Sequence, residues 1–248
     1  MMLRRILDAC GGTLPDDVHV LFANTGKERV ETLEFVRDCA DQWSVPIHWI
    51  ERPAGGGVVE TNFAMAARNG EPFDALVDQR NYLPNPVTRF CTQELKIRVM
   101  RDWMRAAGYD TWVNVVGMRA DEPRRVAKGK AREGHDDWTL AYPLYDAGVR
   151  VADVAAFWKA QTFDLRLQPW EGNCDICFLK GFAKRVRIIE DRPDLAAWWI
   201  SAEERVGATF RNHEPSYARV VEWTKTQRRL PLAEVETDEE SVDCGCTD

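Results

Sequence analysis

The order of elements between residues 18 and 50 constrains the fold more than any other feature of the sequence. Residues 18–23 form a short β-rich apolar run, the loop Asn24-Thr25-Gly26 ends it, and residues 46–50 form a second such run. Between the two runs, apolar residues recur at helical spacing, at Val30, Leu33, Val36, Ala40 and Trp43. A strand, a helix and a strand joined by short connections predict a parallel βαβ unit.

The rest of the chain extends this pattern. Further strands are predicted at Thr111–Val116 and Leu140–Leu144. Helices are predicted at Met1–Cys10, around Asn62–Arg68, from Gln93 to Ala107 with Thr92 as its cap, around Val151–Trp158, and three times after Gly172. We therefore predict an α/β protein with a doubly wound, mostly parallel sheet and a helical C-terminal region.

Three regions are expected along the 248 residues. Residues 1–170 would form the α/β domain, and residues 171–233 a cysteine-bearing helical region. Residues 234–248 form an acidic tail that contains Cys-Gly-Cys.

The charge of the chain is unevenly distributed. The net charge is −7, and Glu234–Asp248 alone carries seven acidic residues and no basic one. Arg89–Arg132 holds eleven basic residues against five acidic ones, an excess that can attract phosphate or sulfate or simply form a solvated helix face. No run approaches the ~20 apolar residues of a membrane helix, and the N-terminus lacks a secretory pattern. These features predict a cytoplasmic protein.

Two loops that follow predicted strands are candidates for anion binding. Asn24-Thr25-Gly26 would lie at the carboxyl edge of the sheet, where open α/β sheets bind ligands. Gly117-Met118-Arg119 opens a second loop that runs to Arg125 and combines three arginines with an acidic pair. Guanidinium groups bind phosphate and sulfate in a bidentate manner, although a charged surface loop is the alternative reading.

The cysteines suggest a metal or redox site. Cys174 and Cys177 form a C-x-x-C pair, and four thiolates are needed for a structural zinc or a typical iron–sulfur cluster. The remaining ligands could come from Cys91 and from Cys244 or Cys246, or the pair could be a redox dithiol. Cys10 and Cys39 fall in helical patterns and are predicted to be small core residues.

Taken in order, these segments resemble the phosphoadenosine phosphosulfate (PAPS) reductase family, part of the adenine nucleotide α-hydrolase-like or N-type ATP pyrophosphatase (PP-loop) group. The matching segments cover about Val18 to Lys180. They are Phe22–Gly26 with Glu31-Thr32, Arg89–Thr92 with Lys96, Gly117–Arg125, Pro143-Leu144 with Asp153-Val154, and Cys174-x-x-Cys177.

The resemblance implies an enzyme of sulfur metabolism that acts on an adenine nucleotide, ATP or PAPS. Asn24, Thr25, Gly26, Gly117 and Met118 would shape the nucleotide pocket. Lys96, Arg119 and Arg125 would hold phosphate or sulfate and stabilise developing charge. Cys91, Cys174, Cys177 and Cys246 would hold a [4Fe–4S] cluster, with zinc as the alternative and Cys244 as the alternative fourth ligand.

The chain departs from the family pattern at three places. It begins at what looks like the helix after the family's Ser-Gly-Gly-x-x-Ser phosphate loop, so we expect the natural gene product to begin earlier and this chain to bind ATP weakly. Asn24 replaces the family's acid, and the Glu-Cys-Gly-Leu-His motif of true PAPS reductases is absent.

Two other functions remain open at this stage. Relatives with the same fold adenylate and thiolate nucleic acids, and a chain without the phosphate loop could be a non-catalytic, metal-bearing nucleotide-binding module. The expected partners are an adenine nucleotide, a thiol or electron-donor protein, a nucleic acid and a second copy of the chain, with no membrane.

Overall fold

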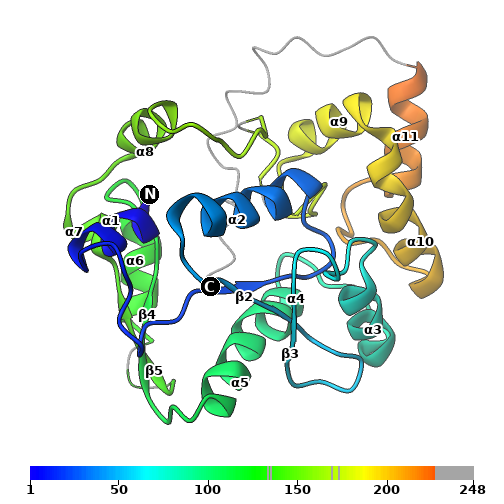
Figure 1. Ribbon diagram of the computed structural model, residues 1–248. Coiled ribbons are helices and arrows are strands. Elements are labelled where there is room, and N and C mark those ends of the chain that lie inside the picture. The colour runs from blue at the N-terminus through cyan, green and yellow to red at the C-terminus, as the bar shows by residue number, and fades with distance from the viewer. Residues whose placement is uncertain (133, 135, 169, 173, 227–248) are drawn as a thin grey trace.

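The computed structural model describes residues 1–226, except 133, 135, 169 and 173 (Figure 1). It is a mixed α/β structure with two small sheets. The first holds β1 (Leu21–Ala23), β2 (His48–Glu51) and β3 (Val59–Thr61) in that order. The second pairs β4 (Trp112–Val115) with β5 (Trp138–Ala141).

The predicted βαβ unit is confirmed. β1 and β2 pair in parallel, with Leu21 opposite His48, and α2 (Val30–Trp43) connects them. Alternate strand residues face opposite sides. Phe22 and Trp49 therefore pack with Leu33 of α2, whereas Ala23 and Ile50 pack on the other face.

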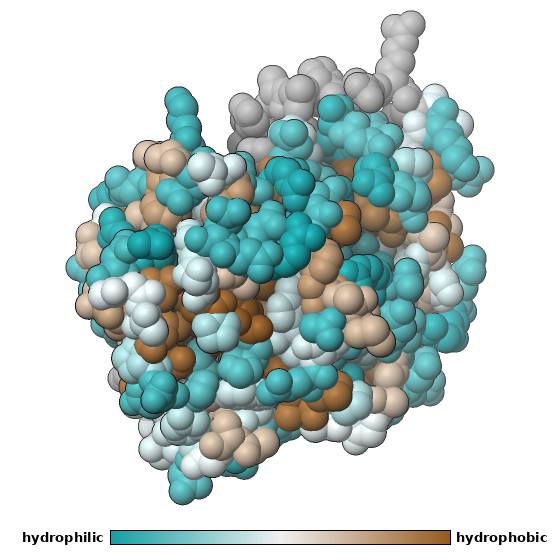
Figure 2. Space-filling model, viewed as in Figure 1, coloured by the Kyte–Doolittle hydropathy of each residue, from teal (hydrophilic) through white to brown (hydrophobic). Residues whose placement is uncertain are grey.

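The helix on that other face is α5 (Arg98–Ala106), which contributes Val99, Trp103 and Met104. Figure 1 accordingly shows α2 and α5 on either side of the β1–β2 pair, and Figure 2 shows hydrophilic side chains over the outward face of α2.

The segment between β2 and α5 differs from its prediction. The helix expected around Asn62–Arg68 is absent; residues 59–61 form β3, which pairs antiparallel to β2, and α3 spans Glu71–Arg80. Thr92 does not cap a helix, because it has helical backbone angles and lies inside the short helix α4 (Phe90–Thr92). A π-helical turn, η1 (Gln93–Ile97), joins α4 to α5.

The β4–β5 half was predicted in part. β4 and β5 are both present and pair in parallel, but β5 begins at Trp138 rather than Leu140, and it ends at Ala141 because Pro143 opens a short helix, α7 (Pro143–Asp146). The helix that begins at Pro123, inside the predicted loop, was not predicted. Beside this pair lie α1 (Met2–Ala9) and α6 (Pro123–Lys130), whereas α8 (Val151–Lys159) packs on α1 and α2 through Phe157 and Trp158. Cys10 is exposed just after α1, so its prediction as a core residue was wrong, whereas Cys39 is buried as predicted.

The C-terminal region consists of α9 (Phe182–Asp191), a 3₁₀ turn η2 (Pro193–Leu195), α10 (Ala196–Val206) and α11 (Tyr217–Thr226). Gly207, with φ of +71°, ends α10 as expected for a left-handed cap. The core under these helices also contains Phe73, Leu76 and Leu95, so the main apolar cluster spans the predicted boundary at residue 170. Among the helices that the structure describes, none has the length and apolar character needed to cross a bilayer.

Candidate functional site

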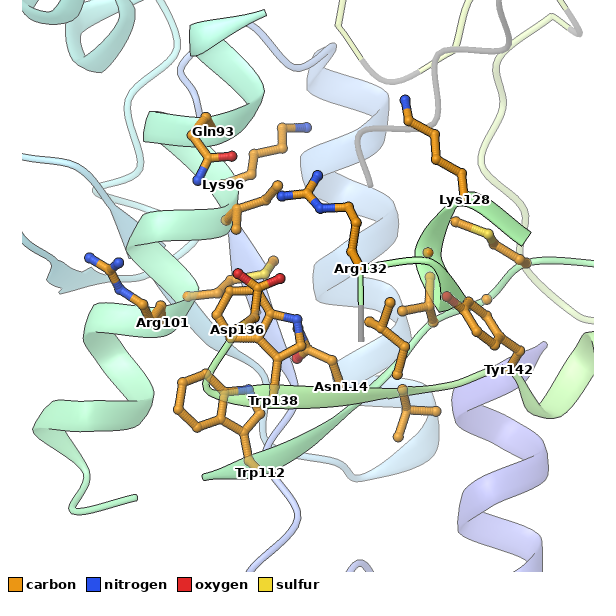
Figure 3. Close-up of a pocket in the computed structure, with 18 residues that line it drawn as sticks. Gln93, Lys96, Arg101, Trp112, Asn114, Lys128, Arg132, Asp136, Trp138 and Tyr142 are labelled. Atoms are coloured by element: carbon orange, nitrogen blue, oxygen red, sulfur yellow. The ribbon is translucent and has the colours of Figure 1, made fainter. Parts of the chain in front are cut away.

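A cavity of about 290 Å³ lies between η1 and α5 on one side and β4 and β5 on the other (Figure 3). We call it the basic cavity. Within the described part of the chain, four basic side chains line it against one acidic side chain, Asp136; the basic ones are Lys96, Arg101, Lys128 and Arg132. Figure 3 shows the charged ends of Lys96, Lys128 and Arg132 gathered on one side of this space. The basic cavity is therefore suited to an anionic ligand.

Aromatic side chains form another part of the same wall. Trp112 and Trp138 are directly opposite in the β4–β5 register, and their rings stack with centroids 5.4 Å apart. Both lie well away from the Lys128 end of the cavity in Figure 3. Half-buried indoles beside cations provide a surface on which a nucleobase can stack. Gly117 and Met118, two of the residues predicted to shape a nucleotide pocket, also line the basic cavity.

A second, much smaller cavity of about 20 Å³ lies beside the first, and we call it the thiol cavity. Cys91, Cys174 and Cys177 all line it, together with Thr25 and Lys96. The structure thus brings together three of the four predicted cysteine ligands, although Cys91 and Cys174 are more than 80 residues apart in sequence. Lys96 lines both cavities, so it lies where they meet.

The fit of a metal to this cavity depends on its donors. Three thiols suit a soft metal, but within the described residues no group of three or more potential ligands is arranged to hold one. Cys244 and Cys246, the candidates for the fourth ligand, lie outside the described residues.

Glu28 is a site residue that the sequence analysis missed. Its buried carboxylate accepts hydrogen bonds from the Thr25 backbone N–H at 2.8 Å and the Thr25 hydroxyl at 2.9 Å. Its Oε1 lies 3.4 Å from Nζ of Lys96. Glu28 therefore fixes the loop after β1 to the lysine shared by the two cavities. Only its position three residues after Thr25, typical of a carboxylate that closes a turn, could have indicated this role.

A buried ion pair joins the same loop to residues 174–177, which we call the cysteine turn. Nζ of Lys27 lies 2.9 Å from Oδ2 of Asp175, and both side chains are less than a tenth exposed. The Asp175 backbone N–H donates to the Lys27 carbonyl at 3.0 Å, and Glu28 forms a β-bridge with Cys174. Two segments remote in sequence are thereby held together beside the thiols.

Asn24 and Gly26 support the loop from within. The Asn24 side-chain amide donates to Glu51 at 2.6 Å and to the Ala67 carbonyl at 2.8 Å, so Asn24 joins the loop to β2. Gly26 has φ of +76°, and a Cβ there would lie 3.1 Å from the Gly70 backbone. A side chain at residue 26 would push apart the backbone segments that contain Gly26 and Gly70. Both residues shape the loop, and neither lines either of the two cavities.

The two predicted anion-binding arginines are bound to their own loop. Nε of Arg119 lies 2.8 Å from Asp121, and Arg125 pairs with Glu122, whose Oε2 accepts the Arg119 backbone N–H at 2.9 Å. Burial acts to raise the pKa of Asp121, but the Val151 N–H and Arg119 outweigh it and lower that pKa. Neither Arg119 nor Arg125 lines the basic cavity. Lys128, on α6, and Arg132, just after α6, line it instead.

The shape of η1 explains how Lys96 reaches this position. The turn Gln93–Ile97 is π-helical, and Gln93 and Lys96 from it both line the basic cavity. Single π turns inside helices are frequent at functional sites.

Comparison with known proteins gives one informative relative. The nin region protein ORF290 of Escherichia phage lambda, described as uncharacterized, is 29% identical over 187 residues, which cover 68% of this chain and 58% of that protein. The chain therefore spans less than two thirds of the length of this relative. No family model matches the chain, and no solved structure matches it.

Proposed function

We propose that the protein is a PAPS-reductase-like enzyme that binds an adenine nucleotide in the basic cavity and performs sulfur chemistry on it at the thiol cavity. One observation carries this proposal: Lys96 lines both a cavity suited to an anionic nucleotide and a cavity lined by three thiols. The reaction class is reduction of a sulfonucleotide or a related sulfur transfer.

The residues have distinct roles in this proposal. Trp112 and Trp138 stack with the base, while Lys96, Lys128 and Arg132 bind phosphate or sulfate through charge-assisted hydrogen bonds. Lys96 also faces charge that develops near the thiols, and Glu28 holds its ammonium group in place. Gly117 and Met118 bring backbone close to the nucleotide.

Cys91, Cys174 and Cys177 would supply three thiolates to a [4Fe–4S] cluster or a zinc ion. Such a centre would stabilise these thiols and tune the charge beside the bound nucleotide. The proposal also includes the doubly wound arrangement. In its support, the pairs β1–β2 and β4–β5 are each parallel, and predicted site residues follow both β1 and β4.

Calorimetric titration with PAPS, adenosine phosphosulfate and ATP tests the binding step. We expect Lys96→Ala to weaken binding of the sulfonucleotides by about 10- to 100-fold, because a charge-assisted bond is lost. Arg37→Ala removes an ion-paired arginine that lines neither cavity, so it should bind like the parent. Equal affinities for Lys96→Ala and Arg37→Ala would exclude the basic cavity as the nucleotide site.

Turnover is tested separately. The parent and the three single Cys→Ser variants at residues 91, 174 and 177 are incubated with PAPS and a reduced thiol donor, and sulfite release is measured. We expect release by the parent and its loss in each variant. Release that is unchanged in all three variants would contradict a role for the thiol cavity.

A further inference from the structure

The basic cavity continues into a neighbouring hollow of about 180 Å³, the outer hollow, which lies between α5 and residues 136–138. The two spaces share Gln93, Ile97, Arg101, Asp136 and Trp138 as lining residues, so they form one groove, which we call the α5 groove. The added hollow brings in two more arginines from α5, Arg98 and Arg105. The site is thus longer than the pocket to which the proposed function refers.

The charge of the α5 groove exceeds that of its first cavity. Among the residues that the structure describes, its walls carry two acidic residues, Asp136 and Asp137, against six basic ones. The basic residues are Lys96, Arg98, Arg101, Arg105, Lys128 and Arg132. An excess of this size along an elongated groove is suited to a ligand with several negative charges in a row.

The spacing of these cations points to a chain of phosphates. Arg98, Arg101 and Arg105 recur every three to four residues of α5, which places them on one face of the helix. Seven residues of helix separate the first from the last, a rise of about 10 Å. Lys128 and Arg132 lie on the far side of the basic cavity from Arg101 in Figure 3. Cations therefore lie on both sides of the space in which a base would bind.

The aromatic pair sits between these charges. Trp138 lines both parts of the α5 groove and stacks with Trp112. A nucleobase stacked on aromatic rings, with its flanking phosphates bound by cations on either side, is how proteins hold single-stranded nucleic acid. A single nucleotide would leave the arginines of the outer hollow without a role.

The ion pairs along α5 leave the arginines available to phosphate. The side chains of Arg98 and Arg105 are 47% and 54% exposed, and they pair with Glu94 and Asp137. The Arg105–Asp137 pair is partly exposed and contributes little to stability, so a phosphate can replace Asp137 at small cost. The Glu94 carboxylate is buried, but it also pairs with Arg80, so it keeps a cationic partner when Arg98 binds a phosphate.

We propose that the α5 groove binds a single-stranded nucleic acid, so that the nucleotide in the basic cavity is one unit of a strand. This inference rests on the proposed function only in taking the basic cavity as a nucleotide site. The groove arginines would bind the phosphates on one side of that unit, and Lys128 and Arg132 those on the other.

Fluorescence anisotropy with labelled 12-nucleotide DNA and RNA strands of one sequence tests the proposal on the full chain. We expect the logarithm of the association constant to fall linearly with the logarithm of the salt concentration, with a slope of about −2 to −3. This slope corresponds to three or four phosphate contacts to a single strand. Arg98→Ala/Arg105→Ala should weaken strand binding at least about tenfold and leave mononucleotide binding unchanged, because neither residue lines the basic cavity.

A matched control is Arg4→Ala/Arg37→Ala, which removes the same charge from ion-paired arginines of comparable exposure elsewhere. This control should bind the strand at least threefold more tightly than the groove variant does. Arg98→Lys/Arg105→Lys keeps the charge and should restore most of the affinity, which excludes misfolding as the cause of the loss.

The outcomes separate this inference from the proposed function. Mononucleotide binding without strand binding overturns the groove and leaves the proposed function standing. Strand binding that depends on Arg98 and Arg105, in a chain that binds no free nucleotide, supports the groove and overturns the proposed function. Equal displacement of the strand by a polyglutamate peptide of the same charge also overturns the inference, since it would show attraction to any polyanion.

Discussion

The thiol cavity and the basic cavity share Lys96 but are built in opposite ways. Around the thiol cavity, Lys27 and Asp175 are 6% and 4% exposed, and backbone and side-chain hydrogen bonds join their segments. Around the basic cavity and its groove, arginines reach solvent, and Arg101 and Arg105 pair with the partly exposed carboxylates of Asp102 and Asp137. The comparison indicates that groups proposed to react are held rigidly, whereas groups proposed to recognise the ligand can change partners.

The largest expected effect tests the rigid side of this comparison. Asp175→Ala leaves the Lys27 ammonium buried without its partner, so we expect the free energy of unfolding to fall by about 3–5 kcal/mol. Arg101→Ala breaks a partly exposed pair with Asp102 and should cost about 0–1 kcal/mol. Urea unfolding followed by tryptophan fluorescence measures both. Similar losses for the two variants would mean that the cavities do not differ in this way.

The reactivity of the cysteines sharpens the comparison. Burial raises the pKa of Cys39 to about 12, whereas Cys10 is exposed. At pH 8 we expect iodoacetamide to modify Cys10 at least about a hundredfold faster than Cys39, because the thiolate is the nucleophile. Cys174 and Cys177 are as inaccessible as Cys39 and should react as slowly.

Peptide mass spectrometry after timed alkylation provides these rates. Unfolding in urea should make all the cysteines react alike. Modification of Cys174 and Cys177 as fast as that of Cys10 in the native protein would show that the thiol cavity opens to solvent.

The smallest expected effect concerns the support of the cysteine turn by the C-terminal helices. Burial raises the pKa of Glu203, although the N–H groups of Tyr217 and Phe210 donate to its carboxylate and favour the charged form. The Tyr217 hydroxyl in turn donates to the Ile176 carbonyl at 2.7 Å, within the cysteine turn.

A raised pKa in the folded state makes Glu203 contribute stability that is complete below about 4.5 and is lost as pH rises through the folded pKa. We therefore expect Glu203→Gln to flatten the fall in unfolding free energy above pH 4.5, whatever its effect on stability at one pH. Urea unfolding at several pH values from 4.5 to 7 measures this. A parallel pH profile for variant and parent would contradict it.

Much of the local structure could be predicted from the sequence. The apolar spacing from Val30 to Trp43 predicted α2, and Pro193 and Gly207 marked the limits of the helical segment that holds α10. These signals are local, because they depend on helix periodicity and on the backbone angles of Pro and Gly. β3 was missed because Val59–Thr61 is short, exposed and without alternation of apolar residues.

The candidate site was predicted less well, because it depends on contacts between distant segments. The cysteine types and spacing predicted a thiol cluster, and the structure places three of those cysteines around one cavity. The sequence could not show that Glu122 pairs with Arg119 and Arg125, nor that Arg132 lines the basic cavity in their place. Which of several arginines faces a cavity is decided by tertiary packing.

The π turn at Gln93–Ile97 determines in which direction the side chains of α5, the helix that follows it, point. Each residue of an α-helix advances the direction of its side chains by about 100°, so a turn that accommodates one extra residue rotates the whole of the next helix by that angle relative to a regular continuation. Here it lets Leu95 remain buried in the core while Lys96 and Arg101 line the basic cavity and Arg98 lines the outer hollow. The turn therefore allows one part of the helix to pack in the core while the charged face of the next part lies along the groove.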